Sequence, residues 1–242
     1  MTRPSRRALT ILDSLVGRGV RVDAVVLDRG GLRPPDMVRR TRGVWRRGGP
    51  ADAYRRMRRR VTRAMSRRQR AHGQRYTDYA SVVHTVSDIN SEESRRLLES
   101  LSPDVVVLGS SRILKPPVIE IPTWGVLNAH PGLLPAYRGV DVIHWALRNG
   151  DPLGVTVHRV DAGIDTGPIL ARRTYEIEPG DTVGSIKRRA FALAGDMMAD
   201  VVRRIAADEP LEEMTQDRSA SRLYGRMTPL QRREVEEGLR AR

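Results

Sequence analysis

Residues 125–170 limit the possible folds of this chain more than any other stretch. They begin with an apolar run in which Asn128 and His130 alternate with apolar residues, so a strand would place the amide and the imidazole on one face. A loop rich in Gly and Pro follows, then a short helical pattern and a second, β-branched run at 155–160. Asp165 lies in the loop after that second run. Strand, helix and strand in this order indicate an α/β fold, in which polar side chains gather at the ends of the strands.

Hydrophobic periodicity predicts further helices and strands on both sides of this stretch. Helices are expected at 8–16, 90–101, from 183 onward and near 228–231, and strands are expected at 20–27, 81–86, 105–108 and 174–177. We therefore expect an α/β protein with a Rossmann-like, doubly wound, mostly parallel sheet. One domain is expected at 1–207, followed by a polar C-terminal extension with a short helix at 208–242.

The start of the chain departs from this pattern because a helix comes before any strand. Doubly wound sheets grow outward from a central first strand, and the turn after that strand feeds the first helix. Residues 1–7 are polar and basic and include Pro4, so we expect the first central strand to be missing from this sequence. Two explanations are open. Either an upstream segment with a strand and a glycine-rich turn completes the sheet, which we favour, or the flanking strands close up.

The chain contains no cysteine, which excludes disulfides and metal sites built on cysteine sulfur. No metal site is predicted from the other residues. No stretch approaches the roughly 18 consecutive apolar residues of a membrane span, and the basic N-terminus has no apolar signal-peptide core behind it. We therefore expect a cytoplasmic protein without membrane contact.

The formal charge of +14 raises the alternative of a nucleic-acid partner, because arginine clusters neutralise phosphates. Residues 39–75 carry 15 arginines and one acid, Asp52, and their apolar residues predict a basic amphipathic helix near 52–71. Such a helix can follow a phosphate backbone or a membrane surface, or it can be a solvated face over an apolar stripe. Among the 43 basic residues only Lys115 and Lys187 are lysines, which is typical of a codon bias toward Arg. The solvated face is therefore the favoured interpretation.

Four short motifs follow one another in the central part of the chain: NAH at 128–130, PGLLPAYRG at 131–139, GVTVH at 154–158 and DAGIDTG at 161–167. Together they resemble the formyltransferases that use 10-formyltetrahydrofolate, a family that includes the glycinamide ribonucleotide, methionyl-tRNA and sugar-nucleotide enzymes. The resemblance implies a formyltransferase-like catalytic domain at 1–207, with 10-formyltetrahydrofolate as co-substrate.

The resemblance also implies which residues form the site. It assigns catalysis to Asn128, His130 and Asp165. The loop after strand 105–108 would line the folate pocket, with backbone groups meeting the pterin ring; otherwise this loop is an ordinary connection with its arginine in solvent. The residues implied to contact folate are Ser111, Arg112, Ile113, Leu114, Asp161 and Gly163, and those implied to contact the substrate are Gly132, Leu133, Tyr137 and Arg138.

The three implied catalytic groups suit the transfer of a formyl group to an amine. This reaction passes through a tetrahedral intermediate whose oxygen becomes negative and whose attacking nitrogen must lose a proton. Asn128 and His130 can supply preorganised N–H donors to that oxygen, and Asp165 can orient or charge the imidazole and relay the proton. Each also has a structural interpretation, because Asn128 can satisfy backbone groups, His130 can fill a core site and Asp165 can be a turn residue.

Two further histidines lie close to these residues in the sequence. His144 is on a helical stretch and His158 continues a strand alternation, so packing or surface roles are predicted for both. Gly132 stands where many family members have a serine after the His-Pro pair, so a hydroxyl contact from this position is absent.

The sequence therefore predicts a folate-dependent formyltransferase acting on a primary amine of a small, anionic molecule, such as an amino-sugar nucleotide or a natural-product precursor. The residues after Asp165 leave little room for the C-terminal domain that methionyl-tRNA enzymes append, so a tRNA substrate is not expected. Hydrolysis of formyltetrahydrofolate is the alternative within the same fold. A non-catalytic, basic nucleic-acid-binding protein is the alternative from another class, and a homodimer is compatible with the sequence.

Overall fold

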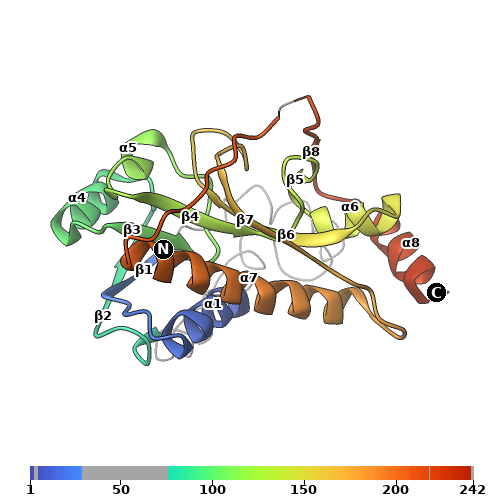
Figure 1. The fold of residues 1–242 in the computed structure, drawn as a ribbon, viewed down its shortest axis with the longest axis horizontal. Coiled ribbons are helices and arrows are strands. Elements are labelled where there is room, and N and C mark those ends of the chain that lie inside the picture. Colours follow the sequence, from blue (N-terminus) through green and yellow to red (C-terminus); the bar gives the residue numbers. More distant parts are fainter. Residues whose placement is uncertain (3–4, 29–75, 218, 241–242) are drawn as a thin grey trace, which may run out of the picture.

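The computed structural model describes residues 1–2, 5–28, 76–217 and 219–240 (Figure 1). Its helices are α1 (Arg6–Gly17), α4 (Glu92–Leu101), α5 (Pro116–Ile119), α6 (Val142–Asn149), α7 (Val183–Ala206) and α8 (Pro229–Arg240). Its strands are β1 (Ala24–Asp28), β2 (Val82–Val86), β3 (Val105–Leu108), β4 (Gly125–His130), β5 (Arg138–Gly139), β6 (Leu153–Arg159), β7 (Ile169–Tyr175) and β8 (Leu223–Tyr224). The basic helix expected near 52–71 lies outside the described residues.

The strands form one four-stranded and two two-stranded sheets. β3, β4, β6 and β7 are neighbours in that order, β1 pairs with β2, and β5 pairs with β8. The pairs β1–β2, β3–β4 and β5–β8 are parallel, whereas β6 runs antiparallel to both β4 and β7. The predicted α/β class with a mostly parallel, Rossmann-like sheet is confirmed.

Two residues at the start of the chain lie between β1 and β3, at the position of the expected central strand. The backbone N–H of Thr2 donates to the Val26 carbonyl at 2.9 Å, and the Thr2 carbonyl accepts from Asp28 N–H at 2.9 Å. On the other side, the Gly109 N–H donates to the Met1 carbonyl at 3.1 Å. Within the described residues, the flanking strands have not closed up, and Met1 and Thr2 join them.

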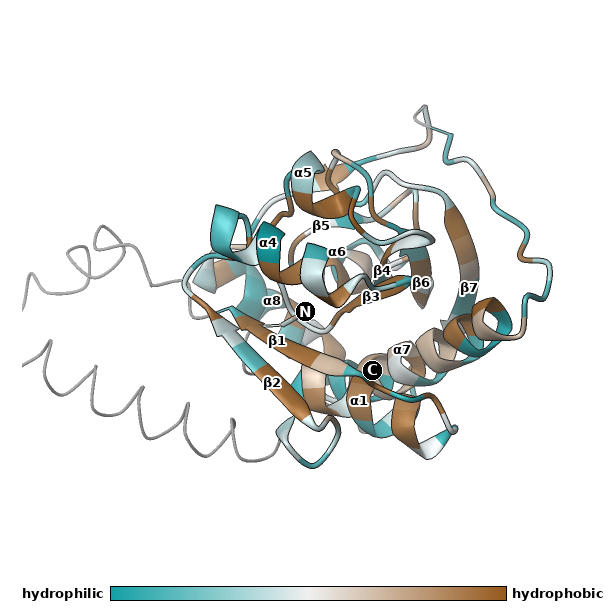
Figure 2. Ribbon diagram, turned by 90° about the vertical axis from the view of Figure 1, so that its left-hand side faces the viewer, coloured by the Kyte–Doolittle hydropathy of each residue, from teal (hydrophilic) through white to brown (hydrophobic). Residues whose placement is uncertain are grey.

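Helices cover both faces of the sheet, as Figure 2 shows with α1 and α7 on one side and α4 and α5 on the other. The alternation of the strands separates their side chains between these two layers. Leu127 and Ala129 of β4 belong to the apolar cluster that contains residues of α1 and α7, whereas Val126 belongs to the cluster that contains residues of α4 and α5. Thus β4 is buried on both faces, and only its end is free to carry polar chemistry.

Most predicted elements are present, with shifts at their ends. The strand expected at 20–27 begins only at Ala24, because its pairing with β2 begins there. The edge strand expected at 174–177 is instead β7, whose pairing with β6 runs from Ile169 to Tyr175. Pairing with a distant strand decides where each of these strands begins and ends.

The segment after residue 207 packs on the rest of the molecule. Tyr224 of β8 stacks on Tyr137 with a centroid distance of 5.0 Å, and Met227, Val235 and Leu239 belong to the same apolar cluster as α7. The boundary expected at 207 therefore does not mark a loss of contact with the core. None of the helices in the described ranges is long and apolar enough to cross a membrane.

Candidate functional site

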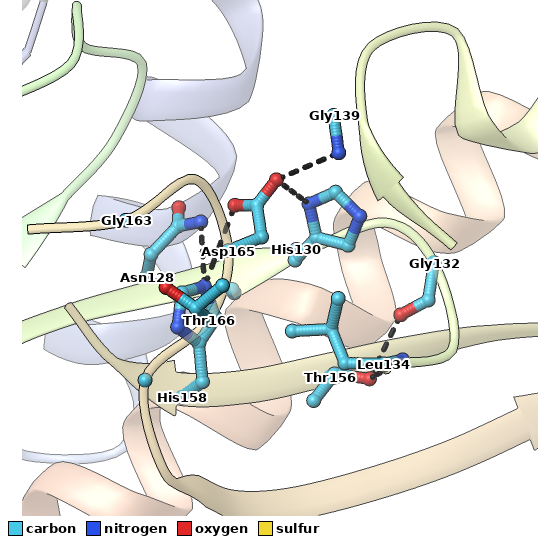
Figure 3. Close-up of polar contacts among 12 residues, drawn as sticks. Asn128, His130, Gly132, Leu134, Gly139, Thr156, His158, Gly163, Asp165 and Thr166 are labelled. Carbon is cyan, nitrogen blue, oxygen red and sulfur yellow. Dashed lines mark hydrogen bonds and ion pairs between the residues drawn. The ribbon is translucent and has the colours of Figure 1, made fainter. Parts of the chain in front are cut away.

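β4 brings two of the expected catalytic side chains to one place. Asn128 and His130 lie at its carboxyl end, two residues apart and therefore on the same face. The antiparallel register with β6 sets His158 opposite Asn128 and Thr156 opposite His130. Figure 3 shows Asn128, His130 and His158 around the carboxylate of Asp165, which comes from the loop between β6 and β7.

His130 is buried, with 3% of its surface exposed, and its two ring nitrogens have different surroundings. Nε2 lies 2.7 Å from the carbonyl oxygen of Tyr137, which can only accept, so Nε2 carries the proton of the neutral ring. Nδ1 lies 3.5 Å from Asp165 Oδ2. Burial lowers the pKa of His130 to about 4 although Asp165 opposes this effect, so the ring is neutral near pH 7 and Nδ1 is a proton acceptor.

The position of His130 changes its expected role. An N–H aimed at a substrate oxygen was one of its predicted functions, but in this orientation the Nε2–H is taken by Tyr137. The ring is instead arranged to receive a proton on Nδ1. The resulting imidazolium would lie between the Tyr137 carbonyl and the Asp165 carboxylate, both of which stabilise positive charge.

Asp165 is ionised and firmly held. Its Oδ2 accepts a hydrogen bond from the backbone N–H of Gly139 at 2.9 Å, and its Oδ1 lies 3.6 Å from His158 Nε2. Burial raises its pKa, but the nearby His158 and His130 rings and the Gly139 N–H outweigh burial and lower the pKa to about 2. Its backbone φ of 52° lies in the left-handed region, an uncommon conformation for a residue other than glycine.

The loop that carries Asp165 is held in shape by its own side chains. Asp161 Oδ1 accepts hydrogen bonds from the Gly163 N–H at 3.0 Å and from the Thr166 hydroxyl at 2.6 Å. A side chain at Gly167 would place its Cβ 1.9 Å from the Arg159 carbonyl oxygen, so only glycine allows the loop to approach β6. From the C-terminal segment, Gln216 Nε2 donates to the carbonyls of residues 165 and 167 at 3.1 and 2.6 Å.

A cavity of about 690 Å³ opens beside these groups. Asn128, His130 and Asp165 form part of its wall. All of the residues expected to contact folate also line it, namely Ser111, Arg112, Ile113, Leu114, Asp161 and Gly163. Ile113 is 64% exposed, and the Ser111 hydroxyl is buried without a hydrogen-bond partner among the described residues.

Arg112 lies at the cavity, but its guanidinium is already engaged. Nε donates to Asp28 Oδ2 at 2.9 Å and NH1 donates to Asp88 Oδ2 at 3.3 Å. The carboxylate of Asp28 is buried, so this ion pair ties the loop to the end of β1. Arg112 therefore does not extend into solvent, as the interpretation of this loop as an ordinary connection had it.

The residues expected to contact the substrate lie behind the cavity wall and not in it. The backbone of Gly132 passes His130 so closely that a Cβ would lie 3.0 Å from Nε2, and Leu133 packs over Gly154. The Tyr137 hydroxyl is hydrogen-bonded to Asp151 and Asn149, and Arg138 lies beside a separate hollow next to Asp161. Gly132 and the Tyr137 carbonyl thus lie against the His130 ring, and Leu133 lies against Gly154.

The cavity wall includes residues that sequence reasoning did not assign to the site, among them His158, Arg7 and Lys187. The ring of His158, for which a packing or surface role was predicted, lies 3.1 Å from Asn128 and faces Asp165. Arg7 of α1 donates to Asn128 Oδ1 at 3.3 Å, and Lys187 of α7 lines the cavity. His158 belongs to the alternation of a different strand, β6, and no local signal in the sequence distinguishes Arg7 from the many other arginines.

No cluster of three or more His, Asp or Glu side chains within the described ranges could hold a metal ion. The groups that line the cavity include the Asn128 amide, the neutral His130 imidazole, the Asp165 carboxylate and the cations of Arg7 and Lys187. This set can donate a hydrogen bond to an oxygen that gains charge, accept a proton and stabilise the cation so formed.

Comparison with known sequences points to one family. Residues 52–202 match the sequence profile of a family described as formyl transferase. The methionyl-tRNA formyltransferase of Aromatoleum aromaticum is 37% identical over 129 residues, which cover 52% of this chain and 41% of that protein. The chain spans about half the length of the curated relatives it matches.

Solved structures share the fold. A 4-N formyltransferase from Francisella tularensis matches with a TM-score of 0.61 and 14% identity, covering 97% of this chain and 84% of that one. The glycinamide ribonucleotide transformylase 1 of Symbiobacterium toebii matches with a TM-score of 0.59 and 23% identity, covering 89% and 92%. At these identities the likeness concerns the architecture alone.

Proposed function

The chain belongs to the formyl transferase family, and from this premise we propose that it transfers a formyl group from 10-formyltetrahydrofolate to a primary amine. One observation carries the proposal. A neutral, buried imidazole, an ionised carboxylate and a side-chain amide converge on one wall of a cavity, with His130 Nδ1 3.5 Å from Asp165 Oδ2.

The cavity wall suits a folate as donor. Partly exposed apolar side chains, Ile113, Val140 and Ile164, line it and offer contact area for a flat ring system. The buried Ser111 hydroxyl, which lacks a partner in the described part of the chain, offers a hydrogen bond to a polar edge of such a ring. These observations support the expected folate contacts of the 110–114 loop.

Each catalytic group has a role that follows from its surroundings. The amine nitrogen bonds to the formyl carbon, the bond from that carbon to the folate nitrogen breaks, and the folate nitrogen gains a proton. Asn128 Nδ2 donates to the formyl oxygen as its charge grows. His130 Nδ1 accepts the proton that the amine loses, directly or through a water, and Asp165 stabilises the imidazolium until the proton passes to the folate nitrogen.

The charge of the cavity supports an anionic acceptor. Lys187 lines it on the side of α7, and burial lowers the pKa of this side chain below its usual range. A cation withdrawn from water is stabilised when an anion joins it. We therefore propose a small anionic amine as the acceptor, such as an amino-sugar nucleotide or another phosphorylated amine.

The experiment that tests this function incubates the chain with 10-formyltetrahydrofolate and a panel of amines. The panel includes amino-sugar nucleotides, phosphorylated amines, uncharged amino sugars and methionyl-tRNA. Absorbance follows the release of tetrahydrofolate, and mass spectrometry identifies the product. A formylated anionic amine supports the proposal, formate alone indicates hydrolysis, and folate that stays intact while nucleic acid binds in a salt-sensitive way indicates the non-catalytic alternative.

Substitutions in the site test the assignment of roles. Asn128→Ala and His130→Ala are each expected to lower turnover at least about 100-fold, because each removes a group that acts in the transition state. Circular dichroism and thermal unfolding check that the variants remain folded. Near-native turnover in both would contradict the assigned trio.

A further inference from the structure

Arg7, which reaches the site from the first turn of α1, contacts the catalytic amide directly. Its NH2 donates to Asn128 Oδ1 at 3.3 Å and also donates to the backbone carbonyl of Ala129. Its guanidinium carbon lies 5.8 Å from the centroid of the Phe191 ring of α7. Contacts from β4 and from α7 thus hold the guanidinium in place.

The contact with Arg7 determines which way the amide of Asn128 points. The two ends of a side-chain amide are similar in shape, so their hydrogen-bond partners decide the orientation. A guanidinium only donates, so the atom that faces Arg7 must be Oδ1. The Nδ2 end is then directed toward His158, at 3.1 Å from Nε2.

The orientation of the amide in turn determines the proton position on His158. Nδ2 donates, so His158 Nε2 must accept. The other ring nitrogen, Nδ1, lies 2.9 Å from the Arg159 carbonyl, which can only accept, so Nδ1 carries the proton. Asp165 Oδ1 also approaches Nε2, but at 3.6 Å it is farther away than Asn128 Nδ2 at 3.1 Å, so we assign the hydrogen bond of Nε2 to the amide. Each of the three contacts, from Arg7 to Asn128, from Asn128 to His158 and from His158 to Arg159, therefore pairs one donor with one acceptor.

We propose that Arg7 is a positioning residue that keeps the N–H end of Asn128 directed toward the reacting oxygen and keeps His158 protonated on Nδ1. This role rests on the proposed formyl transfer. One hydrogen of Nδ2 is used by His158, and the second remains for the formyl oxygen. In the flipped amide, a carbonyl oxygen would face that oxygen and repel its growing negative charge. The contribution of Arg7 thus falls on the transition state and not on substrate binding.

The test compares Arg7→Met, Arg7→Lys and the wild type, with Arg6→Met as the control. Methionine keeps much of the volume and cannot donate, lysine keeps a donor, and Arg6 is an exposed neighbour on the same helical turn. Turnover in Arg7→Met is expected to fall about 10- to 100-fold at an unchanged KM for the amine, less than the roughly 100- to 1000-fold cost of removing an oxyanion donor outright, because the amide is still present. Arg7→Lys is expected to recover part of the loss, and Arg6→Met is expected to match the wild type.

A second measurement does not depend on turnover. Long-range proton–nitrogen correlation spectra report which ring nitrogen of a histidine carries the proton, and loss of a signal in His158→Asn assigns it. We expect Nδ1–H in the wild type and in Arg6→Met, and a rise of Nε2–H in Arg7→Met. A wild-type Nε2–H form, or a tautomer that Arg7→Met leaves unchanged, overturns the proposal even if formyl transfer is found.

Separate effects of the Arg7 variants on turnover and on KM distinguish a positioning role from substrate binding. A rise in KM without a fall in turnover would show that Arg7 binds the substrate and would overturn the proposal. If the chain transfers no formyl group to any amine, the proposed function fails, while the tautomer of His158 still decides whether Arg7 orients the amide.

Discussion

The buried ring of His130 couples folding to pH. Its pKa in the folded protein is lowered to about 4 from an ordinary value near 6.5, so the folded state binds fewer protons than the unfolded state between these values. Stability is therefore expected to decrease as pH falls through this window, by about 3 kcal/mol in total. Urea unfolding at several pH values between 4 and 7 measures this slope. His130→Asn is expected to flatten it, and an unchanged slope in that variant would contradict a buried neutral histidine.

The loop between β6 and β7 depends on a residue from the C-terminal segment. Gln216 holds the carbonyls of residues 165 and 167, so Gln216→Leu is expected to loosen the loop and displace the Asp165 carboxylate. A displacement of 1 Å in a site can cost about 100-fold in rate, and we expect a smaller loss of about tenfold in turnover. Steady-state kinetics measure it. Asp217→Ala is the control, because the exposed Asp217 side chain is hydrogen-bonded only to Ser219 among the described residues. Equal turnover in the two variants would contradict a role of Gln216 in holding the loop.

The packing of α1 against α7 joins the first helix of the chain to the layer under the sheet (Figure 1). Gly195 allows this approach, since a Cβ there would lie 2.5 Å from the Ser14 hydroxyl oxygen and 3.1 Å from the Thr10 carbonyl. Gly195→Ala is therefore expected to destabilise the protein by about 1 to 3 kcal/mol. Gly184→Ala, in the first turn of the same helix with no atom closer than 3.6 Å, is expected to stabilise it by up to about 1 kcal/mol. Urea unfolding compares the two variants, and a change of the same sign in both would contradict the packing argument.

Helices and strands that depend on local periodicity could be predicted from the sequence. The helix at 8–16 corresponds to α1, the strand at 105–108 to β3 and the long helix from 183 to α7. Asn128 and His130 could be assigned to one face because side chains alternate along any strand, whatever it pairs with. The order of the motifs brought Asp165 into the same hypothesis.

The tertiary structure alone decided what surrounds these residues. His158 became a neighbour of Asn128 through the register of two antiparallel strands, and Arg7 and Gln216 reached the site from segments far away in the chain. Tyr137 was expected at the substrate, yet its carbonyl accepts from His130 and its ring stacks on Tyr224. Periodicity belongs to a short stretch of sequence, whereas register and packing depend on contacts between distant residues that no local pattern encodes. The sequence therefore predicted that Asn128, His130 and Asp165 lie together, but it did not predict their hydrogen-bond partners.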